Sequence, residues 1–550
     1  MKKIQLEKAK PITEAIVPAE ISASQCESQT PITTCLEQNI TWVEQYFVRC
    51  SDLIVRRFCI GETYPCDAVL LYLDGMTDSA VVHDNILSPL MCPVCIDAAM
   101  GQKVSQDYFS FMKTQLLPAG EITSVNVMED GVQAMMNGDV FLLLDGSATG
   151  LTIDAKGFPH RDMGEPRNEK TLRGPQEAFV EAMRVNTAML RRRLHTSQLK
   201  LEQLTLGTYT QTQVSIVYLE HLANDNIIAE LRRRLNNIKQ VDSILNASCI
   251  EQYIEDRPFS IFPQVQYTER PDKTAAALLE GRVALIVDGS PDVMLLPVLF
   301  TQLLQSPEDY YNRIIPGTFI RWIRYIGLFI ATTLPSLYVA VTSFHPELIP
   351  LNLLLSIAAA REGVPFPAVA EALIMELAFE LLREASIRMP GAIGNTIGIV
   401  GALVIGDAAV SARLVAPQMV IVVAITAIGS FAIPSVEASY PIRLIRFPLM
   451  ILAATLGLYG VMLGWLVILM YLVQLRTFGF PYLAPLAPLK NHELMALAVR
   501  MPRWCMMVEP LFHKRGGNVP SGCSFFHRAI QPLKQKGDES RGQQQNNFKS

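Results

Sequence analysis

Six charged side chains interrupt an otherwise apolar stretch between residues 366 and 389, namely Glu371, Glu376, Glu380, Arg383, Glu384 and Arg388. If the stretch is a helix, spacing by four places Glu376, Glu380 and Glu384 along one side, with Arg383 beside them. At membrane depth such a face needs water or protein around it. One interpretation is therefore a hydrated cation path lined by these four residues. The alternative, equally compatible with the spacing, is an amphipathic helix in the headgroup layer with internal Glu–Arg pairs.

A second recurring pattern is an apolar segment that ends in an Asp-Gly turn. Residues 138–147 (GDVFLLLDGS) and 281–290 (GRVALIVDGS) share Gly, Val, Leu, Asp, Gly and Ser at matching places. The repeat predicts two related α/β lobes, with candidate turn sites at the carboxyl end of a buried strand, where open α/β sheets bind ligands. An ordinary strand and tight turn explains the same residues without a ligand. The candidate residues are Asp145, Gly146, Asp288 and Gly289.

Arginine triplets occupy two stretches with helical periodicity, at residues 191–193 and 232–234. We interpret them as solvated helix faces, with an anionic-ligand site as the sharper alternative.

Short catalytic motifs are missing from the sequence. It contains no GxxxxGK[ST], no GxGxxG after a strand, no HExxH and no GxSxG, so we expect no enzyme activity and no cofactor. Cys92 and Cys95 have the spacing of a redox or half-zinc motif but lack the second pair of ligands. His345 is either a proton relay or, more simply, part of a polar turn. The formal net charge of −5 gives no support for nucleic-acid binding.

Long apolar segments after about residue 326 predict four membrane spans. Arg321 and Arg324 precede the first, which places that side in the cytoplasm, as does the expected absence of a secretory signal. Arg443 and Arg446 precede the last span on the side that four simple crossings place outside, and charge counting leaves this conflict open. The predicted spans are Ile326–Phe344, Ala392–Ala412, Val415–Pro434 and Phe447–Val473.

The expected fold class is an α/β N-terminal cytoplasmic region with two related lobes, followed by an α-helical multi-pass membrane domain. Its parts are a disordered lead-in (1–45), a first lobe (46–160), a helical connection with the second lobe (161–315), the membrane domain with its acidic helix 366–389 (316–485), and a basic cytoplasmic tail (486–550). Both termini are expected to be cytoplasmic.

Ordered motifs resemble the A subunits of GerA-type spore germinant receptors. They are Arg173–Asn186 (RGPQEAFVEAMRVN) with Arg191–Leu194, Phe262–Gln264 with Thr268–Asp272, Gly281–Val283 with Val287–Pro291, Leu334–Val339, Arg361–Pro367 and Arg383–Ala385. The similarity extends over about residues 46–485. The related sporulation protein of the SpoVA group is the competing assignment.

This resemblance implies a nutrient-sensing role in the inner membrane of the endospore, and no enzymatic activity. It implies work with a transporter-like B subunit and a lipoprotein C subunit, and a homo-oligomeric ring, possibly a pentamer, with a ligand-gated cation path. Neither nucleic acid nor a cofactor is implied. A non-conducting signalling scaffold is the alternative.

Overall fold

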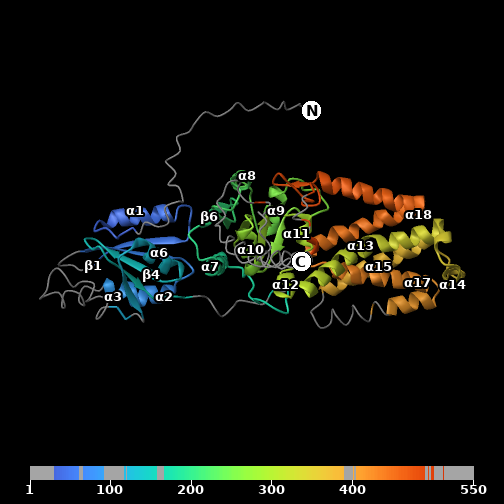
Figure 1. Cartoon of the computed structure of the whole chain (residues 1–550), viewed down its shortest axis with the longest axis horizontal. Helices are drawn as coiled ribbons and strands as arrows, with labels where there is room; N and C mark the ends of the chain where they lie inside the picture. Colours follow the sequence, from blue (N-terminus) through green and yellow to red (C-terminus); the bar gives the residue numbers. More distant parts are fainter. Residues whose placement is uncertain are drawn as a thin grey trace, which may run out of the picture. The chain divides into compact units, whose positions relative to one another are not determined.

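The computed structural model describes residues 30–60, 66–91, 117–118, 121–157, 166, 168–388, 401, 404–489, 494, 497–500 and 512. Their contacts divide the chain into two compact units. The first comprises Met1–Tyr46, Ile54–Leu73 and Thr77–Lys156, and the second comprises Phe47–Leu53, Asp74–Met76 and Gly157–Ser550 (Figure 1).

The first α/β region is built on a five-stranded sheet of order β1-β2-β4-β5-β3. Its central strand β4 is a run of five buried apolar residues, which a strand needs when helices cover both faces of a sheet. The strands are β1 (Leu53–Ile60), β2 (Cys66–Leu73), β3 (Ile122–Val125), β4 (Val140–Leu144) and β5 (Gly150–Ile153). The helices are α1 (Leu36–Tyr46), α2 (Ser79–Val81), η1 (Val82–Leu87), α3 (Ser88–Leu90) and α6 (Met128–Met136).

Helix α1 corrects part of the predicted lead-in. Leu36, Ile40 and Val43 recur at helical spacing and are buried. The segment therefore has the apolar face that an ordered amphipathic helix requires, and the expected disorder of residues 1–45 is wrong where α1 forms.

The second α/β region, residues 168–299, has a sheet of order β6-β7-β9-β10-β8, which is the first order with every number raised by five. Separate apolar clusters cover its two faces, one containing α8 and α9 and the other α7 and α10. The strands are β6 (Leu199–Leu206), β7 (Thr212–Leu219), β8 (Gln266–Thr268), β9 (Val283–Val287) and β10 (Val293–Leu296). The helices are α7 (Met183–Arg193), α8 (Asp225–Asn237), α9 (Ala247–Ile254) and α10 (Pro271–Leu279).

Strand pairing in both sheets is antiparallel wherever its register is described, including β4 with β5 and β9 with β10. The two Asp-Gly turns therefore connect neighbouring antiparallel strands. They do not lie at the carboxyl edge of a parallel sheet, so the reason for expecting ligand sites there does not apply.

A helical bundle follows the second sheet. Two of its helices, α13 and α18, are long and apolar enough to cross a membrane, and α14 and α17 are shorter apolar helices. The elements are α11 (Phe300–Leu303), α12 (Glu308–Tyr311), α13 (Ile314–Phe344), η3 (Pro346–Leu348), α14 (Leu351–Arg361), α15 (Ala368–Arg388), α17 (Pro417–Phe431), α18 (Val436–Gln474), β11 (Arg476–Thr477) and β12 (Phe480–Pro481). The predicted first and third spans overlap α13 and α17, whereas the second lies mostly outside the described residues.

Helix α18 reverses direction at Gly457. That residue has non-helical angles (φ 62°, ψ −142°). A Cβ atom added to Gly460 would collide with the Leu452 carbonyl, and one added to Gly464 would collide with Leu449. In one straight helix residues 452 and 460 would be about 12 Å apart. The chain therefore folds into two antiparallel arms, residues 436–456 and 458–474, and the prediction of one straight crossing from Phe447 to Val473 is wrong (Figure 1).

Candidate functional site

Buried ion pairs join α15 to the first arm of α18. Arg446 Nη1 donates to Glu376 Oε2 at 2.5 Å, and both side chains are at most 1% exposed. Arg443 Nη1 donates to Glu380 Oε2 at 2.8 Å, and Arg446 Nη2 lies 3.8 Å from Glu380 Oε1. We call these four residues the charged core.

Antiparallel packing explains the pairing. Glu376 and Glu380 are one turn apart on α15, and Arg443 and Arg446 are about one turn apart on α18. The earlier glutamate meets the later arginine, as antiparallel helices require. The two arginines that conflicted with a four-span topology are therefore the counter-charges of the acidic helix.

Several polar atoms in and beside the charged core have no hydrogen-bond partner among the described residues. They are Glu376 Oε1, Glu380 Oε1, Arg446 Nε and Arg383 Nη1. Arg383 stacks over the Phe431 ring at 4.8 Å. Unsatisfied buried polar atoms of this kind are uncommon in folded proteins, so the core is a polar site with incomplete hydrogen bonding inside an apolar bundle.

Two other acidic residues of α15 lie outside the charged core. Glu384 is exposed and pairs with Arg388 at 2.5 Å. Glu371 is fully buried, accepts from Ala416 N at 2.9 Å just before α17, and pairs with Arg361 at 3.2 Å. The structure thus brings Glu376 and Glu380 together, places Arg383 beside them and separates Glu384.

The carboxylates of the Asp-Gly turns hold helix starts. Asp145 Oδ1 accepts from Leu36 N at 3.1 Å, at the first residue of α1. Asp288 Oδ1 accepts from Met183 N at 3.0 Å, at the first residue of α7. These bonds satisfy amide groups that a helix leaves unpaired, which is a structural role for both aspartates.

The glycines of the same turns have matching environments. Gly146 (φ 77°) donates to Thr34 O at 2.9 Å, and Gly289 (φ 80°) donates to Glu181 O at 2.8 Å. The positive φ favours glycine at both places. The two turns therefore repeat the same geometry, which holds the start of a helix. This geometry requires no ligand.

The arginine triplets are engaged in ion pairs. Arg191 is 2% exposed and donates to both oxygens of Asp52 at 2.8 and 3.0 Å, so its interpretation as part of a solvated face is wrong. Arg192 and Arg193 share Glu177. Arg232, Arg233 and Arg234 likewise pair with Glu202, Glu230 and Asp256.

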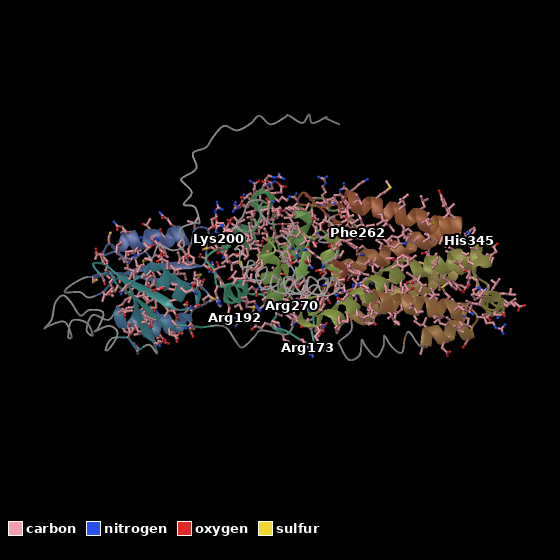
Figure 2. The ribbon with its side chains drawn as sticks, in the orientation of Figure 1. Arg173, Arg192, Lys200, Phe262, Arg270 and His345 are labelled. Carbon is pink, nitrogen blue, oxygen red and sulfur yellow. The ribbon has the colours of Figure 1, made fainter. Side chains whose placement is uncertain are left out.

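An aromatic junction, defined here as Phe262, Phe300, Tyr471 and Tyr482, connects the second α/β region to the end of α18. Phe262 is buried, and its ring centroid lies 6.0–6.4 Å from those of the other three. Figure 2 shows Phe262 where this region meets the helices and His345 at the opposite end of the bundle. We call these the sheet end and the far end.

Hydrogen bonds reinforce the junction. Tyr471 donates to Ser260 Oγ at 2.9 Å, and Tyr482 donates to the Pro263 carbonyl at 2.8 Å. A displacement of this part of the α/β region must therefore move the end of α18 or break these contacts.

Glu255, close to the junction in the chain, makes stability depend on pH. Burial, with the nearby Glu251, raises the pKa of Glu255 from 4.5 to about 7. The unfolded chain loses this proton near pH 4.5 and the folded chain only near pH 7, so stability falls as pH rises through that window. We expect Glu255→Gln to reduce the loss of Tm between pH 5 and pH 8, measured by thermal unfolding. Equal losses in both proteins would contradict the assignment.

Comparison with known proteins agrees with the motifs quoted above. The profile of the "Bacillus/Clostridium GerA spore germination protein" family matches residues 41–512. The chain belongs to the GerA family. The predicted resemblance is thereby confirmed.

Named relatives of this GerA-family chain cover most of its length. The uncharacterized membrane protein YfkQ of Bacillus subtilis (strain 168) is 41% identical over 88% of this chain and 93% of its own. Spore germination protein KA of the same organism is 40% identical over 87% of each chain. A crystal structure of the N-terminal domain of the A subunit of the Bacillus megaterium spore germinant receptor GerK3 matches 50% of this chain and 99% of its own, with 29% identity and a TM-score of 0.39.

One motif shared with the family contains a fully buried arginine. Arg270 donates to Asp272, Thr171 and the carbonyls of Glu169 and Pro175. It therefore fixes residues 169–175 against α10. The motif is recognisable in the sequence but this role is not, because Glu169, Thr171 and Pro175 lie about 100 residues earlier in the chain.

Some predictions concern residues that the structure does not describe. Cys92, Cys95, most of the predicted span Ala392–Ala412 and most of the basic tail are among them. Within the described part of the chain, no group of three or more His, Cys, Asp or Glu residues is arranged to hold a metal ion.

Proposed function

We propose that this GerA-family chain is the A subunit of a nutrient germinant receptor in the endospore membrane, and that its charged core is a gate. The observation that carries the proposal is the direct link between the second α/β region and this core: the arm of α18 that supplies Arg443 and Arg446 is paired to the arm that ends at the aromatic junction.

In this proposal the bundle is a multi-pass membrane domain, and the directions of its helices support that assignment. Helix α13 runs from the sheet end to Phe344, which lies against Gly457 at the far end. The ion pairs make α15 antiparallel to the first arm of α18, so α15 returns to the sheet end. Gly429, near the end of α17, contacts Gly327 in the first half of α13, whereas Met419, near the start of α17, lies in one apolar cluster with Val339 near the end of α13. Helix α17 therefore also runs toward the sheet end.

Because α15 ends at the sheet end and α17 begins at the far end, the proposal has six crossings in place of four, and the two arms of α18 are the last two. Four and six are both even numbers, so either count returns the chain to the sheet end. The charged core then lies nearer the sheet end than Gly457 does, and the positive-inside rule makes this end cytoplasmic. The relative YfkQ is named a membrane protein, which supports a membrane location for the bundle.

In this arrangement the core is closed, because Glu376 and Glu380 are neutralised by arginines. A cation path along the acidic face requires α18 to move away from α15. A signal can drive that change only if it stabilises the open arrangement more than the closed one. Nutrient capture by a B subunit, a C lipoprotein partner and a ring of A subunits belong to the same proposal.

The second candidate is a scaffold that transmits the signal without conducting. One observation favours it: Arg383, Arg443 and Arg446 outnumber the two carboxylates beside them, which disfavours a cation at that place.

Germination and cation release in spores carrying single Gln variants test the choice. For a gate, Glu376→Gln and Glu380→Gln change the release rate at normal protein abundance. Glu384→Gln is the matched control, because Glu384 is exposed and outside the core. Release at the wild-type rate in both core variants, with abundance verified by immunoblot, would support the scaffold.

A further inference from the structure

A short loop of the second α/β region exposes large apolar side chains. Residues 257–261 (RPFSI) follow α9, and within them Phe259 is 101% exposed and Ile261 is 49% exposed. Single exposed apolar residues are common on protein surfaces. This loop differs from an ordinary exposed apolar residue in where it lies relative to the end of α18.

The loop lies level with the last turn of an apolar helix. Ser260, between the two exposed residues, accepts the hydrogen bond from Tyr471, and the following Phe262 packs on the same ring. Tyr471 is three residues before the end of α18 at Gln474, or about 4.5 Å along the axis. Phe259 is adjacent to Ser260 in the chain, so it is held within a few ångströms of the plane where the apolar helix ends.

Aromatic residues near the start of α13 belong to the same end of the bundle. Phe319 and Trp322 are 62% and 53% exposed, and the Trp322 indole donates to the Ala498 carbonyl at 2.8 Å. Amphipathic aromatic side chains concentrate at the two interfaces between a bilayer and water. Arg257, which is exposed beside Phe259, suits anionic headgroups.

We propose that Phe259 and Ile261 insert into the boundary between headgroups and acyl chains, and thereby fasten the second α/β region to the membrane surface. This inference rests on the membrane placement in the proposed function. The occupant is lipid, because the loop is held at the level where the apolar helix ends. Anchoring at this loop limits how the α/β region can tilt while it remains attached to α18.

Photo-crosslinking in vesicles tests the proposal. The photoreactive analogue benzoylphenylalanine replaces one residue at a time in the full-length chain, reconstituted in phosphatidylglycerol and phosphatidylethanolamine. Position 259 is the test. Leu466, 55% exposed on the second arm of α18, is the bundle reference. Tyr209 is the matched control: it is an 83% exposed aromatic whose backbone amide is bonded to Asp242 of the same α/β region.

The expected result is lipid adducts, identified by mass spectrometry, at positions 259 and 466 and none at 209. Adducts at 466 alone would overturn the inference and leave the membrane placement intact. A protein adduct at 259, with a second copy or a companion subunit, would overturn it in favour of a protein interface. Absence of lipid adducts at both 259 and 466 would overturn the membrane placement itself, and the inference with it.

Discussion

Arg446→Gln should lower the free energy of unfolding by about 3–5 kcal/mol, because it leaves the Glu376 carboxylate buried without its counter-charge. Water cannot compensate for the loss, since both side chains are at most 1% exposed. The double variant Glu376→Gln with Arg446→Gln should be less destabilised than Arg446→Gln alone, because a neutral pair has no uncompensated charge. Reversible denaturation in detergent measures the free energy of unfolding of the wild-type protein and of both variants.

The exposed pair on the same helix supplies the control. Glu384 and Arg388 are 58% and 77% exposed, so Arg388→Gln should change stability by less than about 1 kcal/mol. If Arg446→Gln proves as mild as Arg388→Gln, water reaches the charged core freely in the resting protein, and the description of a closed core is wrong.

Phe262→Ala should open the aromatic junction and cost about 3–5 kcal/mol of packing. The same change should disconnect the second α/β region from α18 and abolish the nutrient response of the spore. Hydrogen exchange over residues 475–483 reports the local opening, and spore germination reports the functional loss.

Tyr471→Phe tests the same junction with a smaller change, since it removes only the hydroxyl that donates to Ser260. Loss of this hydrogen bond should lower the free energy of unfolding by about 1 kcal/mol. Tyr209→Ala, at an exposed aromatic of the same region, should alter neither exchange nor germination. A normal nutrient response in Phe262→Ala spores that contain wild-type amounts of protein would rule out the junction as the transmission route.

The sequence predicted those elements whose formation depends on residues close together in the chain. The acidic helix, expected at 366–389, is α15 at Ala368–Arg388. The two Asp-Gly segments form equivalent strands and turns of two sheets with the same relative order. Both patterns depend on residues close together in the chain, namely helical periodicity and a buried strand followed by a turn.

Pairing between distant elements was not predictable in the same way. Glu376 and Arg446 are 70 residues apart, so their contact depends on the packing of α15 against α18. The available signal was two arginines three residues apart in an apolar run, matching two glutamates four residues apart in another. The hydropathy pattern also did not predict the reversal of α18, because Gly457 is as compatible with an apolar helix as with a turn.

The reversal at Gly457 has a consequence for how the chain is made. In the membrane placement proposed above, two apolar arms joined by a tight turn can leave the translocation machinery and enter lipid together, as one helical hairpin. The arginines of the first arm then need not pass through lipid alone, because the second arm and α15, already synthesised, are available to shield them. The second arm, only residues 458–474, need not be a stable span by itself. A bulkier residue at position 457, which the adjoining Phe344 and His345 would obstruct, should therefore show its first defect during biogenesis, before any germinant is present.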